Sequence, residues 1–167
     1  MFQQCYLNLV IMHITSEEPD NHWGFMSIKD RVILDLGCGK FHSSISTYEW
    51  FLNNGAKKVV GIDLGMENFE HPDFVYQSGG IFSTEQLTQL LSEHTFDSIK
   101  SDIEGAEIHF KDIDQLPFVT EIAIEYHDAS LKQMLLDKFN QWGFTNIEEI
   151  QLSDCDINEQ GVLFTKK

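Results

Sequence analysis

The stretch VILDLGCGKFHSS, residues 32 to 44, decides the fold of this chain. The first part of this stretch belongs to a short run of β-branched and leucine residues, Arg31 to Leu36, which is typical of a buried strand. Two glycines close that run, and the pattern SSISTYEWFLNNG then predicts a helix capped by Ser43 or Ser44 and stopped by Gly55. A strand, a tight turn and a helix in this order predict the first unit of an α/β sheet.

The same alternation continues along the chain. Further strands are expected at 58–63, 73–77, 96–102, 121–127, 145–152 and 161–165, and further helices at 83–94, 104–113 and 129–144. Alternating strands and helices predict a single doubly wound, mostly parallel sheet with helices on both faces. The last two strands have no helix between them, so they predict an antiparallel hairpin at one edge.

The length of 167 residues and the apolar share of 42% fit one domain with a core of its own. We expect this domain to span residues 31–167. Residues 1–30 form an N-terminal segment ahead of the first sheet strand, with His22 and Trp23 near its end. Two roles are open for these side chains, in a lid over the substrate or in ordinary packing.

Charge and cysteine content restrict the partners. Lysine and arginine number 11 against 27 acidic residues, a net charge of −16 that repels phosphate backbones and anionic lipids. We therefore expect neither nucleic acid nor a membrane as a partner. Cys5, Cys38 and Cys155 have no metal-binding spacing, and no apolar run approaches about 18 residues. These features predict a cytoplasmic protein without structural zinc, and they leave its oligomeric state open.

The glycine turn predicts a ligand. The turn lacks the third glycine of a dinucleotide-binding fingerprint, and the pair Gly39 and Lys40 is followed by phenylalanine, where a P-loop needs serine or threonine. What remains is an acid, Asp35, before the glycines and a second acid, Asp63, at the end of the next strand. Asp63 is placed to accept hydrogen bonds from a ribose diol, and Asp35 suits a cation. S-adenosylmethionine combines a ribose diol, an ammonium and a sulfonium group.

At these residues the chain resembles the class I S-adenosylmethionine-dependent methyltransferases. The glycine loop reads DLGCG at 35–39, and Asp63 matches the ribose acid. Two later stretches, KSDIEGAE at 100–107 and IEYH at 124–127, resemble the FkbM-type members of that class. The resemblance implies a Rossmann-like seven-stranded sheet with an antiparallel last strand. It also implies an enzyme that methylates an oxygen of a sugar or another small hydroxylated metabolite.

The resemblance also implies cofactor contacts beyond the two acids. The stretch from Ser78 to Phe82 matches the place where the class holds the adenine ring, with Phe82 or Ile81 packing on it. The usual acid for the adenine amine is missing, and Gln77 or Ser78 stands in its place. The candidate cofactor-binding residues are Asp35, Gly37, Cys38, Gly39, Asp63, Leu64, Ser78, Gly79, Phe82 and Asp102.

Four residues are candidates for catalysis. Asp102, Glu125 and His127 follow or end neighbouring strands, and one of them is expected to remove the acceptor's proton. His127 is favoured because its unperturbed pKa lies near neutrality. Lys100 shares a strand face with Asp102 and is expected to orient the acceptor. The same acids and His127 could hold a divalent metal, but acids beside a cationic cofactor need none, so we expect no metal.

Three other functions remain open. A methyltransferase-like module that has lost catalysis would bind the cofactor without forming product. A nicotinamide-dependent oxidoreductase is disfavoured by the missing third glycine. A nucleic-acid methyltransferase is disfavoured by the net charge and by the lack of a DPPY or NPPF loop after the fourth strand.

Overall fold

The computed structural model describes residues 12–14, 18–39, 43–65, 71–152, 156 and 159–167. The described strands form one eight-stranded sheet in the order β1-β7-β8-β6-β5-β2-β3-β4, in which only β8 runs antiparallel to its neighbours. The strands are β1 (Met12–Ile14), β2 (Val32–Leu36), β3 (Lys58–Asp63), β4 (Phe74–Ser78), β5 (Ser98–Ser101), β6 (Glu121–Tyr126), β7 (Ile147–Leu152) and β8 (Gly161–Lys166). The helices are α1 (Pro19–His22), α2 (Thr47–Asn53), α3 (Thr84–Glu93), the 3-10 helix η1 (Ala106–Asp112) and α4 (Ala129–Gln141).

The predicted fold is confirmed. All seven predicted strands are present, and the connection from β7 to β8 is the predicted hairpin. Its second strand, β8, lies inside the sheet between β6 and β7. The short strand β1 adds an eighth member beyond β7, so the hairpin does not form the edge of the sheet.

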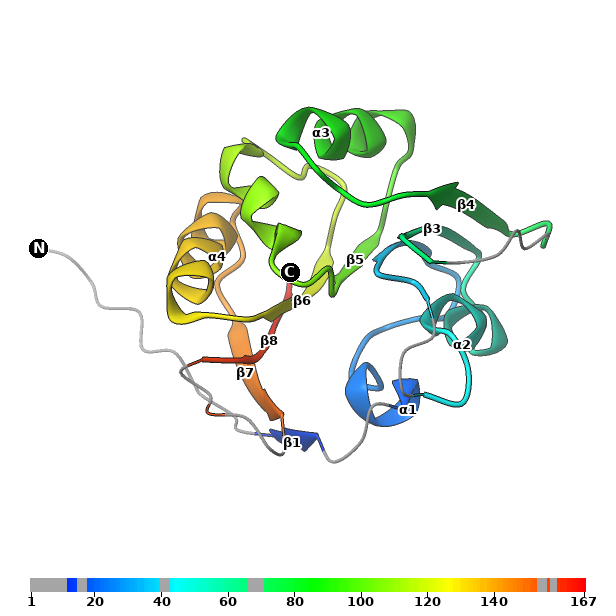
Figure 1. Cartoon of the computed structure of the whole chain (residues 1–167), viewed down its shortest axis with the longest axis horizontal. Coiled ribbons are helices and arrows are strands. Elements are labelled where there is room, and N and C mark those ends of the chain that lie inside the picture. The colour runs from blue at the N-terminus through cyan, green and yellow to red at the C-terminus, as the bar shows by residue number, and fades with distance from the viewer. Residues whose placement is uncertain (1–11, 15–17, 40–42, 66–70, 153–155, 157–158) are drawn as a thin grey trace, which may run out of the picture.

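Helices cover both faces of the sheet (Figure 1), and each face has its own hydrophobic core. Side chains alternate along β2, so Leu34 and Leu36 join the core under α3, η1 and α4, whereas Ile33 joins the core under α1 and α2. The same alternation turns the side chain of Asp35 toward α2, where it contacts Thr47. The polar residue at the centre of this strand therefore lies on the α1 and α2 side of the sheet.

The cap of α2 differs from the prediction. The helix begins after Ser46, and the Glu49 carboxylate accepts a hydrogen bond from the Ser46 backbone N–H at 3.1 Å, as in a capping box. Ser43 and Ser44 bond elsewhere: the Ser43 hydroxyl donates to a nearby carbonyl, and Ser44 donates to Glu18. Ser46 lies just after the two predicted candidates, and only its pairing with Glu49 selects it as the cap. The predicted stop is confirmed, because Gly55 follows the helix at φ +88°.

The glycine turn joins the carboxyl ends of three strands. Gly37 has φ +75°, and its N–H donates to the Ile62 carbonyl of β3 at 2.8 Å. A Cβ at Gly37 would lie 1.9 Å from the carbonyl oxygen of Asp102, which follows β5. A side chain is therefore excluded at Gly37 both by conformation and by contact. The turn thus lies where open α/β sheets bind their ligands.

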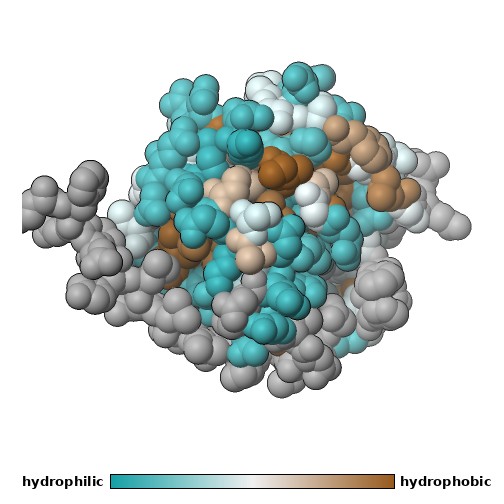
Figure 2. Space-filling model, turned by 60° about the vertical axis from the view of Figure 1, so that its left-hand side comes forward, coloured by the Kyte–Doolittle hydropathy of each residue, from teal (hydrophilic) through white to brown (hydrophobic). Residues whose placement is uncertain are grey.

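The molecular surface carries little contiguous apolar area on the side shown in Figure 2, where hydrophobic residues form small separate areas in a hydrophilic surround. Among the described residues, four large hydrophobic side chains are well exposed: Leu64, Phe82, Ile108 and Phe118. No helix in the described part of the chain is long and apolar enough to cross a membrane.

Candidate functional site

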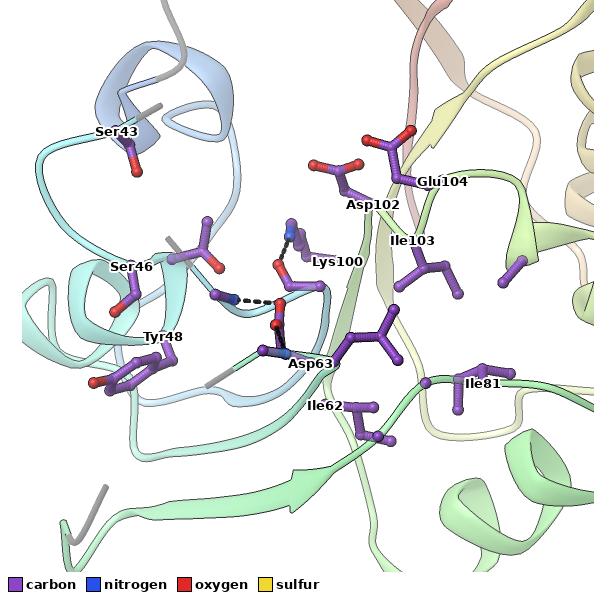
Figure 3. Close-up of a pocket in the computed structure, with 18 of the residues that line it drawn as sticks. Ser43, Ser46, Tyr48, Ile62, Asp63, Ile81, Lys100, Asp102, Ile103 and Glu104 are labelled. Atoms are coloured by element: carbon purple, nitrogen blue, oxygen red, sulfur yellow. Dashed lines mark hydrogen bonds between the residues drawn. The ribbon is translucent and has the colours of Figure 1, made fainter. Parts of the chain in front are cut away.

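A cavity of about 890 Å³ opens beside the glycine turn (Figure 3). Figure 3 shows Asp102 and Glu104 at one end of this cavity and Ile62 and Ile81 at the other. The predicted site residues that line it are Gly37, Gly39, Asp63, Leu64, Gly79, Phe82, Lys100 and Asp102. The predicted site residues that do not line it are Asp35, Cys38, Ser78, Glu125 and His127.

Asp63 ends β3 with its carboxylate at the cavity. Its Oδ2 accepts a hydrogen bond from the Gly39 N–H and its Oδ1 accepts one from the Gly65 N–H, both at 2.8 Å. A Cβ at Gly39 would lie 2.6 Å from Oδ2, so the glycine permits this contact. Each carboxylate oxygen has two acceptor sites, so both oxygens can still accept from ligand hydroxyls. Asp63 therefore offers hydrogen-bond acceptor sites to the cavity.

An apolar slot lies next to Asp63. Leu64 is 74% exposed and Phe82 is 67% exposed, and both line the cavity. A Cβ at Gly80 would lie 2.9 Å from Phe82 and 3.1 Å from Leu64, so the two side chains converge over a backbone without a side chain. Exposed hydrophobic side chains at a cavity mouth suit a flat apolar ligand group. Ile81, the alternative to Phe82, also lines the cavity but is only 4% exposed.

Asp35 does not line the cavity, which corrects the expectation that it binds a cation there. Its carboxylate is fully buried, accepts from the Thr47 hydroxyl at 2.7 Å and pairs with Lys100 Nζ at 3.2 Å. The alternation of side chains along β2 turns it away from the turn and into the α2 side. The Asp35 carboxylate therefore interacts with Thr47 and Lys100 inside the protein and is not available to a ligand in the cavity.

Lys100 is likewise not available to orient an acceptor. Its buried ammonium forms an ion pair with Asp35 and donates to the carbonyl oxygens of Leu36 at 3.2 Å and Gly37 at 2.6 Å. It also lies 5.0 Å from the ring centroid of Trp23. Burial alone would lower the pKa of Lys100, but Asp35 and Asp102 outweigh burial and raise it. Lys100 is therefore a charged support beneath the glycine turn.

Two further cofactor candidates lie outside the cavity. Cys38 is fully buried, and its thiol packs against Gly61 of β3. Burial raises the pKa of this thiol, so it stays protonated. Ser78 lies on a separate, smaller cavity of about 320 Å³ beside α3. The Cys38 side chain therefore lies in the core and Ser78 lines the smaller cavity, so neither lines the larger one.

The three acids of DIEGAE have different roles. Asp102 and Glu104 line the cavity, whereas Glu107 is fully buried and accepts from the N–H groups of Ile103 at 2.7 Å and Gly105 at 2.8 Å. Glu107 thereby folds the loop that carries the other two. Burial raises the pKa of Asp102 to about 7 against the opposing charge of Lys100. Asp102 can therefore exchange a proton near neutral pH.

A polar cluster lies behind this loop. Glu125 is 5% exposed; its Oε2 lies 3.1 Å from His22 Nε2, and its Oε1 accepts from the Gln160 amide at 2.9 Å. His127 Nε2 lies 3.6 Å from the same Oε1 and 3.5 Å from Glu104 Oε2. Atoms of Asp102, Glu125 and His127 that could bind a metal lie within 4.8 Å of one another. His22 and Gln160 each engage one oxygen of Glu125, so a cation there would share these oxygens with two hydrogen bonds.

The N-terminal segment contributes more to the site than its sequence indicated. Trp23 is 2% exposed and belongs to the core under α1 and α2, and the Trp50 indole donates to Asp20. His22 and Trp23 both line the cavity. The partner of His22 is 103 residues away in the sequence, so no local pattern could have revealed their contact.

Comparison with known proteins supports the fold assignment. No protein-family model and no curated protein matches the chain by sequence. Among solved structures, a Plasmodium falciparum protein described as a ribosomal RNA methyltransferase has a TM-score of 0.55 and 17% identity over 89% of this chain and 91% of that one. MycE, a methyltransferase of the mycinamycin pathway solved with Mg and SAH, has a TM-score of 0.57 and 17% identity over 89% of this chain and 44% of MycE.

Fibrillarin, a pre-rRNA processing protein of Methanococcus jannaschii, has a TM-score of 0.52 and 15% identity over 84% of this chain and 68% of that one. At such identities the likeness establishes the fold, and this chain has the fold of the class I S-adenosylmethionine-dependent methyltransferases. The chain spans less than half the length of MycE.

These neighbours correct the prediction that excluded nucleic acid as a partner. That prediction was wrong, because two proteins that share the fold are described by their work on ribosomal RNA or its precursor. The net charge of −16 is a sum over the whole chain, and it does not fix the electric field at the mouth of one cavity. RNA therefore belongs among the acceptors to be tested.

Proposed function

We propose that this protein is an S-adenosylmethionine-dependent methyltransferase that methylates a hydroxyl oxygen of a small hydroxylated metabolite or sugar. The observation that carries this proposal is the arrangement around Asp63. Its carboxylate faces the cavity at the end of β3, between the glycine turn and the apolar slot of Leu64 and Phe82. A ribose acceptor beside a slot for a flat ring fits a nucleoside.

The charge of the cavity supports a cationic cofactor. Among the described residues, Glu49, Asp63, Asp102 and Glu104 line it, and the positive charge of Lys100 is paired with Asp35. Acids in this arrangement attract a sulfonium or ammonium group and repel the pyrophosphate of a dinucleotide. The alternative of a nicotinamide-dependent oxidoreductase is therefore disfavoured again, on grounds independent of the missing glycine.

The residues hold and align the reactants. Asp63 would bind the ribose, Leu64 and Phe82 would pack on the adenine, and the Gly37 and Gly39 backbone would lie along the rest of the cofactor. S-adenosylmethionine, when bound, supplies a methyl group that is activated for transfer to a nucleophile. Alignment of the two reactants in the cavity is the main catalytic contribution expected of the protein. The choice of oxygen as acceptor rests on the resemblance to the FkbM-type enzymes.

Two measurements test this function. Calorimetry should show binding of S-adenosylmethionine and none of NAD. S-adenosylmethionine with a labelled methyl group should then transfer label to at least one compound in a panel of monosaccharides, catechols and RNA, with release of S-adenosylhomocysteine. Binding without release of that product across the panel would favour the module that has lost catalysis. Label on RNA alone would contradict the small-molecule acceptor but not methyl transfer, and absence of binding would overturn the function itself.

We further expect methyl transfer to need no metal. The acids of the Asp102, Glu125 and His127 cluster lie beside the cavity proposed for a cationic cofactor, and acids in that setting need no metal to balance their charge. Activity should therefore survive an excess of EDTA and should not rise when Mg²⁺ or Mn²⁺ is added back. Loss of activity in EDTA with recovery on adding Mg²⁺ would show the expectation to be wrong.

A further inference from the structure

Helix α1 places an imidazole ring in the wall of the cavity. His22 is its last residue, is 3% exposed overall and lines the cavity together with Asp102 and Glu104. This ring comes from the N-terminal segment, outside the alternating strands and helices that carry the glycine turn. The cavity wall at this point is therefore built from two parts of the chain that are distant in sequence.

A buried carboxylate lies behind that ring. Glu125 Oε2 is 3.1 Å from His22 Nε2, and Glu125 itself does not line the cavity. Burial alone would raise the pKa of Glu125, but the hydrogen bonds from His22 and Gln160 outweigh burial and lower it. An ionised carboxylate only accepts, so Nε2 carries the hydrogen and donates it to Glu125. A carboxylate behind a histidine fixes the tautomer and stabilises the ring when it becomes charged.

His127, the ring favoured by the sequence, is placed differently. It does not line the cavity, and its Nε2 is directed at Glu104 and Glu125 at 3.5 and 3.6 Å. His22 is held more firmly, because α1 is tied to α2 through Asp20 and Trp50 and is followed by the core residue Trp23. A base must lie within hydrogen-bond reach of the proton that it removes, and of the two rings His22 meets the cavity.

We propose that His22, oriented by Glu125, is the general base of the methyl transfer and touches the acceptor hydroxyl. This inference rests on the proposed function. In the step, a bond forms between the acceptor oxygen and the methyl carbon while the bond from that carbon to sulfur breaks, and its electron pair stays on sulfur. The hydroxyl proton passes to the imidazole of His22. The products are the methylated acceptor, S-adenosylhomocysteine and an imidazolium ion beside the Glu125 carboxylate.

Kinetics of three variants test the base. His22→Ala should lower kcat about 10²–10⁴-fold with the acceptor from the labelling panel, and S-adenosylmethionine affinity by calorimetry should stay close to wild type. Added imidazole should restore part of kcat, which a merely structural role of His22 would not allow. His94→Ala, at the end of α3 and away from the cavity, is the matched control and should match the wild type. Unchanged kcat in His22→Ala, or a larger loss in His127→Ala, would overturn the proposal.

A second readout needs no turnover and remains informative if a variant folds poorly. Long-range proton–nitrogen NMR on the wild-type protein, with His22→Gln to assign the signals, should show a hydrogen on Nε2 of His22. Glu125→Gln should change those signals more than any signal of His94. A ring with its hydrogen on Nδ1 would contradict the proposal. If no compound in the panel is methylated but the NMR result holds, the proposed function fails and the pairing of His22 with Glu125 stands.

Discussion

Lys100→Met is expected to lower the free energy of unfolding by about 3–5 kcal/mol, the usual cost of removing one partner of a buried ion pair. The substitution leaves the Asp35 carboxylate fully buried with only the Thr47 hydroxyl as a described hydrogen-bond donor. It also removes the donor to the carbonyl oxygens of Leu36 and Gly37. Urea unfolding followed by circular dichroism measures the change.

Two further variants separate the charge from the bulk of the side chain. Lys57→Met changes an exposed lysine and should shift the free energy of unfolding by no more than about 0.5 kcal/mol. The double variant Lys100→Met with Asp35→Asn removes both charges and should recover part of the loss. A loss below about 1 kcal/mol in Lys100→Met would mean that the pair is not the buried support described above.

Asp63→Ala should weaken S-adenosylmethionine binding by at least about 100-fold. Hydrogen bonds to a charged group contribute about 1.5–3 kcal/mol each, and two ribose hydroxyls would lose their acceptor, at about 1.4 kcal/mol per tenfold change in affinity. Calorimetry of the wild type and the variant measures the loss. Asp73→Ala, an exposed acid just before β4, is the matched control and should bind as the wild type does.

The ribose contact can be separated from the support that Asp63 gives the backbone at Gly39 and Gly65. Adenosine carries the ribose diol, and 2′,3′-dideoxyadenosine lacks it. The wild type should prefer adenosine, and Asp63→Ala should bind the two compounds equally weakly. A variant that keeps the preference for adenosine would show that another group reads the ribose.

Much of the fold could be predicted because local patterns carry it. The runs at 32–36 and 59–62 carry apolar residues on both faces, with Asp35 as the exception, as strands between two helical layers do, and the leucines of 83–94 recur at helical spacing. The cap of α2 was missed because three serines near its start are equally suitable locally. Only the reach of the Glu49 carboxylate to Ser46 distinguishes them.

The candidate site, like the fold, could be predicted only where local sequence patterns carry it. The sequence by itself determined the glycine turn and the acid at the end of the next strand, because the conformation of Gly37 and the strand-end position of Asp63 follow from chain order and residue type. Only the tertiary structure decided what each charged side chain faces. Asp35 and Lys100 neutralise each other beneath the turn, and His22 meets Glu125 from 103 residues away. The physical reason is that strand alternation fixes the face a side chain points to, whereas long-range packing fixes which group covers that face.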